Sequence, residues 1–148
     1  MKPNPSVKNY INEETSFGID KIDVFREFKN QIEESKVNVL NNIKNIKKMS
    51  GKIAAYAAPA KASTKLNYYG INSDIIEFIV EDNPLKHNKI IPGVNIPIYN
   101  VDYLIEKDIK VVIVLAWNFF DYIVDKNKSL IEKGIRFISI KELEDQNF

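Results

Sequence analysis

The sequence of 148 residues contains no cysteine and only one histidine. The absence of cysteine excludes disulfide bonds, thiolate catalysis and cysteine-ligated zinc. The longest apolar run, Val111 to Trp117, is far too short to span a bilayer. Residues 1–12 are polar and contain no apolar core of a signal peptide. We therefore expect a cytoplasmic protein without a membrane partner.

A charge excess of either sign is also absent. The chain carries 21 basic and 20 acidic side chains, which gives a formal net charge of +1. Such a balance provides no broad attraction to nucleic acid or to anionic lipid, so neither is expected as a partner. Hydrophobic residues make up 45% of the chain and charged residues 28%, as is typical of a soluble globular protein. The length fits one domain with a buried core.

The first 50 residues predict a lead-in followed by a long helix that packs on the rest of the domain. Residues 1–19 are polar and contain two prolines and a glycine, so they indicate a loose segment with at most a short helix near Tyr10. Between Lys21 and Met49 there is neither glycine nor proline, and Asp20 is a candidate N-cap. Apolar residues recur there at intervals of three, four or seven, which predicts one stripe of a helix roughly 40 Å long; they are Phe25, Phe28, Ile32, Val39, Ile43 and Ile46.

After Gly51 the pattern changes to short apolar runs that alternate with helical segments. Strands are expected at 53–57, 75–80, 96–99, 111–115 and 136–140, and helices at 60–69, 101–107 and 119–133. A long loop over 83–97 is expected between the second strand and the brief edge strand at 96–99. The alternation predicts an α/β fold over residues 51–148, with a Rossmann-like open parallel sheet and helices on both faces.

Ligands of such sheets bind at the carboxyl ends of the strands, so the loop after the first strand is the first candidate site. Its small side chains let a ligand approach the backbone, and the helix that follows directs unpaired N–H groups at an anion. The candidate phosphate-binding residues are Ala58, Pro59, Ala60, Lys61, Ser63 and Thr64. No glycine lies between Gly51 and Gly70, so the dinucleotide fingerprint G-x-G-x-x-G is absent. A tight turn whose alanines serve helix-on-sheet packing is the alternative.

The ends of two other strands supply further candidates. Glu81 follows the second strand, about 20 residues after the first turn, where a Rossmann domain binds a ribose hydroxyl; the alternative is an acid that marks the exit of the strand into solvent. Asn83 begins a turn, and His87 is a candidate substrate contact without a second histidine for metal binding or proton relay. Trp117 and Asn118 either wall a ligand cleft or serve as a core residue and a helix cap.

Three ordered stretches resemble one protein family. The first is YAAPAKAST at 56–64, followed by LNY at 66–68. The second is IEFIVEDNPLK at 76–86, which continues to PG at 92–93 and IPI at 96–98. The third is LAWNF at 115–119. Together they resemble the C-terminal, Rossmann-like domain of the sugar C-methyltransferases, and the long helix resembles that family's entry into the domain.

The resemblance implies a role in a larger enzyme. Members of the family are typically built from an N-terminal zinc domain, a central domain that binds S-adenosylmethionine, and this last domain, and they methylate a carbon of a nucleotide-linked keto-sugar. The last domain helps to bind and enclose the nucleotide sugar. The family's zinc cysteines and methyl-donor glycine loop have no counterpart here. We therefore expect a substrate-binding, accessory domain that is not catalytic on its own, binds no cofactor itself, and acts with a missing or separate S-adenosylmethionine domain.

The matching stretches also contain departures from the family. Ala57 and Ala62 stand where the family usually has glycine, and each is expected to add a methyl group near the ligand surface. Glu81 stands where the family usually has aspartate, whereas Lys61 and Asn118 are retained. Two alternatives stay open: a stand-alone protein that binds a nucleotide or small anion without catalysis, and an interaction module whose helix at 21–49 docks a partner or forms a homodimer.

Overall fold

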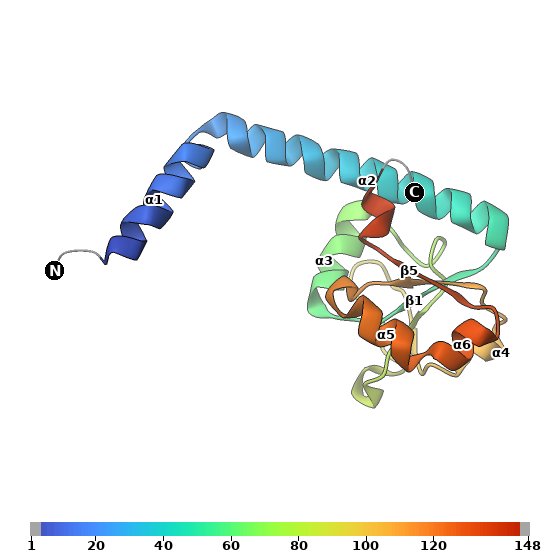
Figure 1. Ribbon diagram of the computed structural model, residues 1–148. Coiled ribbons are helices and arrows are strands. Elements are labelled where there is room, and N and C mark those ends of the chain that lie inside the picture. The colour runs from blue at the N-terminus through green and yellow to red at the C-terminus, as the bar shows by residue number, and fades with distance from the viewer. Residues whose placement is uncertain (1–3, 146–148) are drawn as a thin grey trace. The chain divides into compact units, whose positions relative to one another are not determined.

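The N-terminal part of the chain consists of helix α1 (Pro5–Phe17) and the beginning of helix α2 (Ile22–Ser50). The computed structural model describes residues 4–145, which divide into a unit that ends at Glu34 and a second unit that begins at Ser35 (Figure 1). The first unit has no core of its own, since Gly18 is the one residue of its described part that is classed as buried.

The helix expected near Tyr10 is present as α1, but it is longer than predicted, so the expectation that the rest of this lead-in is loose was wrong. The residues carry helix signals. Pro5 occupies the start of α1, where a missing N–H costs nothing, and the Asn4 side chain accepts a hydrogen bond from Ser6 N. Gly18 ends the helix in the left-handed conformation at φ +83°. Helix α2 begins at Ile22, two residues after the candidate cap Asp20.

The second unit is built on a five-stranded sheet, and it confirms the predicted α/β fold with a parallel sheet. The strands are β1 (Ile53–Tyr56), β2 (Ile79–Val80), β3 (Ile98–Tyr99), β4 (Val111–Val114) and β5 (Arg136–Ser139), in the order β3-β2-β1-β4-β5. All neighbouring strands are parallel, and Ala55 of the central strand is paired with both Ile79 and Ile113. The strand order reverses between β1 and β4, which places the ligand-binding switch point there.

Helices cover both faces of this sheet (Figure 1). Val39 and Ile43 of α2 and Leu66 of α3 (Ala60–Tyr69) join one buried cluster, to which alternate strand residues such as Ala55 contribute. The other cluster contains Ala54 together with residues of α4 (Tyr103–Glu106), α5 (Phe120–Lys126) and α6 (Lys128–Glu132). Strands β1 and β4 are buried on both faces, which explains their continuous apolar runs.

Two predicted elements are shorter or more broken in the structure than the sequence indicated. The strand expected at 75–80 is regular only at Ile79–Val80, because the Asn72 carbonyl accepts hydrogen bonds from Ile75 N and Ile76 N and closes a turn. The helix expected at 119–133 consists of a 3₁₀ turn, η2 (Trp117–Phe119), followed by α5 and α6. The buried Asn127 side chain donates to Ile123 O at 2.8 Å at the break between them.

The end of the described chain is attached to α2. Asn42 Nδ2 donates to Leu143 O at 3.1 Å and to Asp145 O at 3.0 Å, and Asn38 Nδ2 donates to Glu144 O at 2.9 Å. These bonds hold the 3₁₀ turn η3 (Glu142–Glu144) against the helix. In residues 4–145, no helix combines the length and apolarity needed to cross a membrane.

Candidate functional site

Three predicted loops lie at the carboxyl ends of β2, β1 and β4, which are neighbours in the sheet. The structure gathers their side chains into two polar groups. One group surrounds Glu81, beside the end of β2. The other surrounds Lys61, at the start of α3, and lies at the switch point between β1 and β4.

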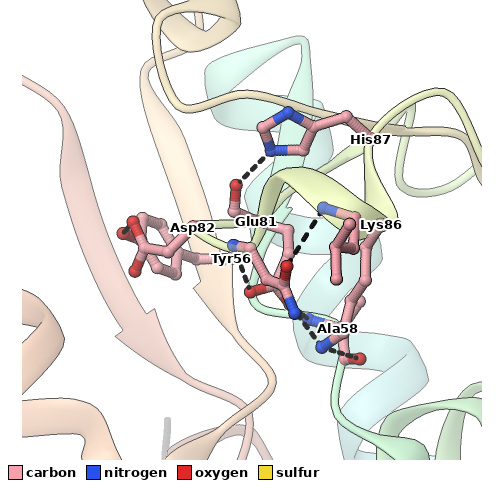
Figure 2. A network of polar contacts seen from close by, with 8 residues as sticks. Tyr56, Ala58, Glu81, Asp82, Lys86 and His87 are labelled. Atoms are coloured by element: carbon pink, nitrogen blue, oxygen red, sulfur yellow. Dashed lines mark hydrogen bonds and ion pairs between the residues drawn. The ribbon is translucent and has the colours of Figure 1, made fainter.

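Glu81 is buried and fully engaged by the protein (Figure 2). Its Oε2 accepts hydrogen bonds from Ala58 N at 2.8 Å and from Lys86 Nζ at 2.9 Å, and its Oε1 accepts one from Asn83 N at 3.1 Å. Lys86 Nζ also donates to Ala58 O at 3.0 Å. Glu81 and Lys86 therefore hold both polar backbone groups of Ala58, and this arrangement is called the Ala58 clamp below.

The clamp controls the ionisation of its carboxylate. Burial acts to raise the pKa of Glu81, but the hydrogen bonds from Ala58 N, Lys86 and Asn83 N outweigh it and lower the pKa below its ordinary value. The carboxylate is thus ionised at neutral pH and balances the Lys86 ammonium. Lys86 is a site residue that the sequence reasoning missed, since no local pattern shows that a lysine five positions after the acid turns back to it.

Ala57, between β1 and the clamp, has a left-handed backbone with φ +69°. A side chain in this region costs roughly 1–2 kcal/mol, and the clamp on the next residue holds the chain there. Ala62 is different, because its methyl group is buried in the core cluster shared by α2 and α3. The expectation that both alanines add a methyl group at a ligand surface was therefore wrong for Ala62.

His87 and Asn83 also contact the backbone of their own loop. His87 Nε2 lies 2.7 Å from Glu81 O, and the ring is half-buried (Figure 2). Asn83 Oδ1 accepts a hydrogen bond from Leu85 N at 3.0 Å and caps the 3₁₀ turn η1 (Pro84–Lys86). In this structure both side chains shape the loop after β2.

The second polar group joins α3 to η2 across the switch point. Lys61 Nζ donates to Asn118 Oδ1 at 2.7 Å and lies 3.8 Å from the centroid of a Trp117 ring. Lys65 Nζ lies 4.5 Å from the centroid of a ring of the same indole and forms an ion pair with Glu144. The side chain of Asn118 thus contacts Lys61 and caps neither η2 nor α5, so its interpretation as a helix cap was wrong. The half-buried Trp117 presents an aromatic surface beside two cations.

The beginning of α3 completes this group. Pro59 takes the N-cap position and makes no side-chain capping bond. Helix geometry leaves the N–H groups of Ala60 and Lys61 without acceptors inside the helix. Ser63 and Thr64 follow in the next turn, half-buried and exposed respectively. These N–H groups and the Lys61 ammonium form a positive end that suits a phosphate.

A hollow of about 460 Å³ adjoins Trp117 at the carboxyl ends of β4 and β5. Aromatic side chains and charged groups line it; they are Trp117, Phe120, Asp121, Ser139, Lys141, Glu142, Glu144 and Asp145. The sequence reasoning missed it, because β5 and η3 carry no motif. Within residues 4–145, no group of three or more acidic or histidine side chains is placed to hold a metal ion.

A third polar contact lies between β1, β2 and α5. Tyr56 Oη donates to Asp82 Oδ1 at 2.9 Å, and Lys126 Nζ forms an ion pair with the same oxygen at 2.6 Å. Burial raises the pKa of the Tyr56 hydroxyl far above its ordinary value, so this group stays protonated. The contact fixes α5 to the carboxyl ends of two strands and thereby supports the loops of the site.

The fold and the site define a Rossmann-like domain with a cationic, aromatic group at its switch point. The chain matches the family model of the C-methyltransferase C-terminal domain over residues 1–140. It is 31% identical over 134 residues to C-methyltransferase NovU of Streptomyces niveus, a match that covers 90% of this chain and 32% of the relative. The chain therefore belongs to the C-methyltransferase C-terminal domain family. It spans about a third of the length of the relative that it matches.

Proposed function

We propose that this chain is the substrate-binding, accessory domain of an S-adenosylmethionine-dependent sugar C-methyltransferase and that it binds the nucleotide part of a nucleotide sugar. The observation that carries the proposal is the position of Lys61. Its ammonium lies at the start of α3, within hydrogen-bond distance of Asn118 and over the Trp117 ring, at the point where strand order reverses.

The chemistry of this group fits a phosphate next to a ring. A phosphate at the start of α3 meets the free N–H groups of Ala60 and Lys61, the positive end of the helix and the Lys61 charge. Ser63 and Thr64 add hydroxyl donors one turn further on. The exposed part of Trp117 offers a flat apolar surface for a base or a sugar ring. The amide of Asn118 adds hydrogen-bonding capacity for sugar hydroxyls.

The other candidate residues stabilise the loops of the site and do not contact the ligand in this proposal. Because Glu81 already accepts the Ala58 N–H, that donor is not offered to a phosphate. In the proposal Glu81, Asn83 and His87 keep the loops after β1 and β2 in place, and the ligand contacts begin at Ala60. S-adenosylmethionine, bound by another domain or polypeptide, supplies the methyl group. The role of this chain is to hold the nucleotide sugar.

The proposal is tested by calorimetric titration of the whole chain with uridine and thymidine diphosphate hexoses. We expect Lys61→Ala to lower the affinity at least tenfold, because a hydrogen bond to a charged group contributes about 1.5–3 kcal/mol. Lys52→Ala is the matched control, since Lys52 is exposed and directly precedes β1 at the opposite edge of the sheet. Equal losses in the two variants, or no heat with any nucleotide sugar, would contradict the proposal.

The same titration separates the remaining alternative of a stand-alone anion binder. A domain that recognises the sugar must bind a nucleoside diphosphate hexose more tightly than the free nucleoside diphosphate. Equal affinity for the two, or for inorganic phosphate, would indicate a binder of small anions that does not recognise the sugar.

A further inference from the structure

The first unit carries an apolar surface that no other residue in its described part, 4–34, covers. Val7, Tyr10 and Ile11 of α1 are exposed, and so are Phe25 and Phe28 of α2. Phe17 is 72% exposed and Phe28 61%. Isolated exposed apolar residues are ordinary, but a cluster of aromatic side chains on two short helical segments without a core is typical of an interaction surface.

Three of these side chains, Phe17, Phe25 and Phe28, line a groove of about 590 Å³. Its apolar wall consists of Phe17, Ile19, Val24, Phe25 and Phe28. Two acidic residues, Asp23 and Glu27, also line it. This groove, called the N-terminal groove below, lies wholly within the first unit.

The groove includes residues of the same apolar stripe of α2 that, further along the helix, packs into the core of the second unit. Val39 and Ile43 have no exposed surface, because they belong to the core of the second unit. Phe25, Phe28 and Ile32 precede them at the three- and four-residue spacing of one helix face, and the two phenylalanines are exposed. One end of the stripe therefore packs against the protein's own sheet, whereas the other end offers the same kind of surface to a partner.

Charge disfavours a second copy of this unit as the occupant. Residues 4–34 contain seven acidic and four basic side chains, a net charge of −3. Pairing two such surfaces brings like charges together, whereas a partner with a basic rim is attracted. The groove thus fits an apolar surface with basic residues around it.

The family assignment indicates where such a partner lies. The family model includes residues 1–34 within a C-terminal domain, and the matched segment is 32% of the relative. In an enzyme of which this domain is the C-terminal part, the remaining part precedes it and adjoins the first unit. We propose that the N-terminal groove docks the catalytic part of a C-methyltransferase. This inference rests on the proposed accessory function, although it does not depend on which sugar is bound.

Alkylation of single cysteines tests the docking, since the chain contains no cysteine of its own. The whole chain carrying Phe28→Cys is treated with iodoacetamide, and its mass is followed with and without the part of NovU that lies outside the matched segment. With that probe at ten times its dissociation constant, alkylation is expected to slow about tenfold. Val37→Cys is the matched control, because Val37 is exposed on α2 outside the stripe and is expected to react at an unchanged rate.

Three results would overturn the inference: equal protection of both cysteines, protection of neither, or protection of Phe28→Cys in the chain alone together with the mass of a dimer. The last result would assign the groove to a second copy. The experiment contains no nucleotide, so its failure is distinct from a failure of nucleotide-sugar binding at Lys61.

A full-length chimera provides a second measurement that needs no separate probe. The whole chain replaces the matched segment of NovU, and unfolding is followed by calorimetry. We expect one cooperative transition, which Phe25→Glu with Phe28→Glu splits into two, whereas Val37→Glu leaves it single. A single transition in the double variant would contradict docking through the groove.

Discussion

The carboxylate of Glu81 lies 2.8 Å from the backbone nitrogen of Ala58, although the two residues are 23 positions apart in the sequence. This bond joins the loop after β2 to the loop after β1, and Lys86 reinforces it from the same side. An acid at this position of a Rossmann fold ordinarily faces a ribose. In this chain it fixes the backbone beside the candidate phosphate site.

The clamp makes Glu81 important for stability. We expect Glu81→Gln to lower the free energy of unfolding by about 2–3 kcal/mol. The glutamine amide would direct N–H groups at backbone N–H donors, and the substitution removes the negative charge that balances Lys86. Urea denaturation at pH 7 measures the change. Asp125→Asn is the control: its ion pair with Lys128 is exposed, so a change of no more than about 0.5 kcal/mol is expected. Similar losses in both variants would argue against the clamp.

The same residue predicts a dependence on pH. The pKa of Glu81 is lowered in the folded state, so the unfolded state takes up a proton first as the pH falls. The contribution of the carboxylate is complete above the unfolded pKa of about 4.3 and is lost as the pH falls through the lower folded value. The stability difference between the native chain and Glu81→Gln should therefore shrink between pH 5 and the acid limit of folding. A constant difference over that range would contradict this assignment.

Ala57 and Ala62 should respond in opposite directions to substitution by glycine. Ala57 has φ +69°, so Ala57→Gly removes backbone strain and is expected to stabilise the chain by about 0.5–1 kcal/mol. Ala62 lies within α3 with its methyl group buried, so Ala62→Gly is expected to cost about 1–2 kcal/mol. Urea denaturation of the two variants measures both values. If both variants changed the free energy of unfolding in the same direction, the backbone conformation at each position would not explain the effect of glycine.

Gly93 should tolerate alanine far less than Gly134 does. Both have left-handed φ angles, +84° and +90°. A Cβ atom at Gly93 would overlap Asn67 Oδ1 and lie 2.8 Å from Asn67 Cγ. A Cβ atom at Gly134 would have no other atom within 4 Å. Asn67 Nδ2 donates to Pro92 O at 2.9 Å, so the overlap also disturbs that bond. We expect Gly134→Ala to cost about 1 kcal/mol from the backbone alone and Gly93→Ala at least about 1 kcal/mol more. Thermal unfolding of both variants separates the cost of the left-handed backbone, which both share, from the cost of the overlap with Asn67, which only Gly93→Ala has.

Much of the fold could be predicted from the sequence because its signals are local. The apolar run at Val111–Val114 and the helix that ends at Gly70 lie where the sequence places them. The errors arose where one side chain redirects the backbone. Asn127 interrupts a helical pattern by bonding to Ile123 O, and no periodicity of apolar residues reveals this.

The site was predicted less completely than the fold. Lys61, Trp117 and Asn118 were selected separately, and the structure brings them together. The roles of Lys86 and Glu144 were not predicted, because each depends on a partner from another loop or helix. The packing of the whole sheet decides which partners a long side chain can reach, and the residues next to that side chain in the sequence do not reveal them.

The amide bonds from Asn38 and Asn42 to the turn at 143–145 have a consequence for the order of folding. They join residues 101, 103 and 106 positions apart, so they close a loop that includes the whole sheet. Contacts of such long range form late, since the intervening chain must first be ordered. During synthesis the part of α2 from Ser35 onward is made before every strand, yet it gains these bonds only after Asp145 has emerged. The first helix of this unit to be synthesised therefore gains part of its hydrogen bonding only when the end of the described chain has been made.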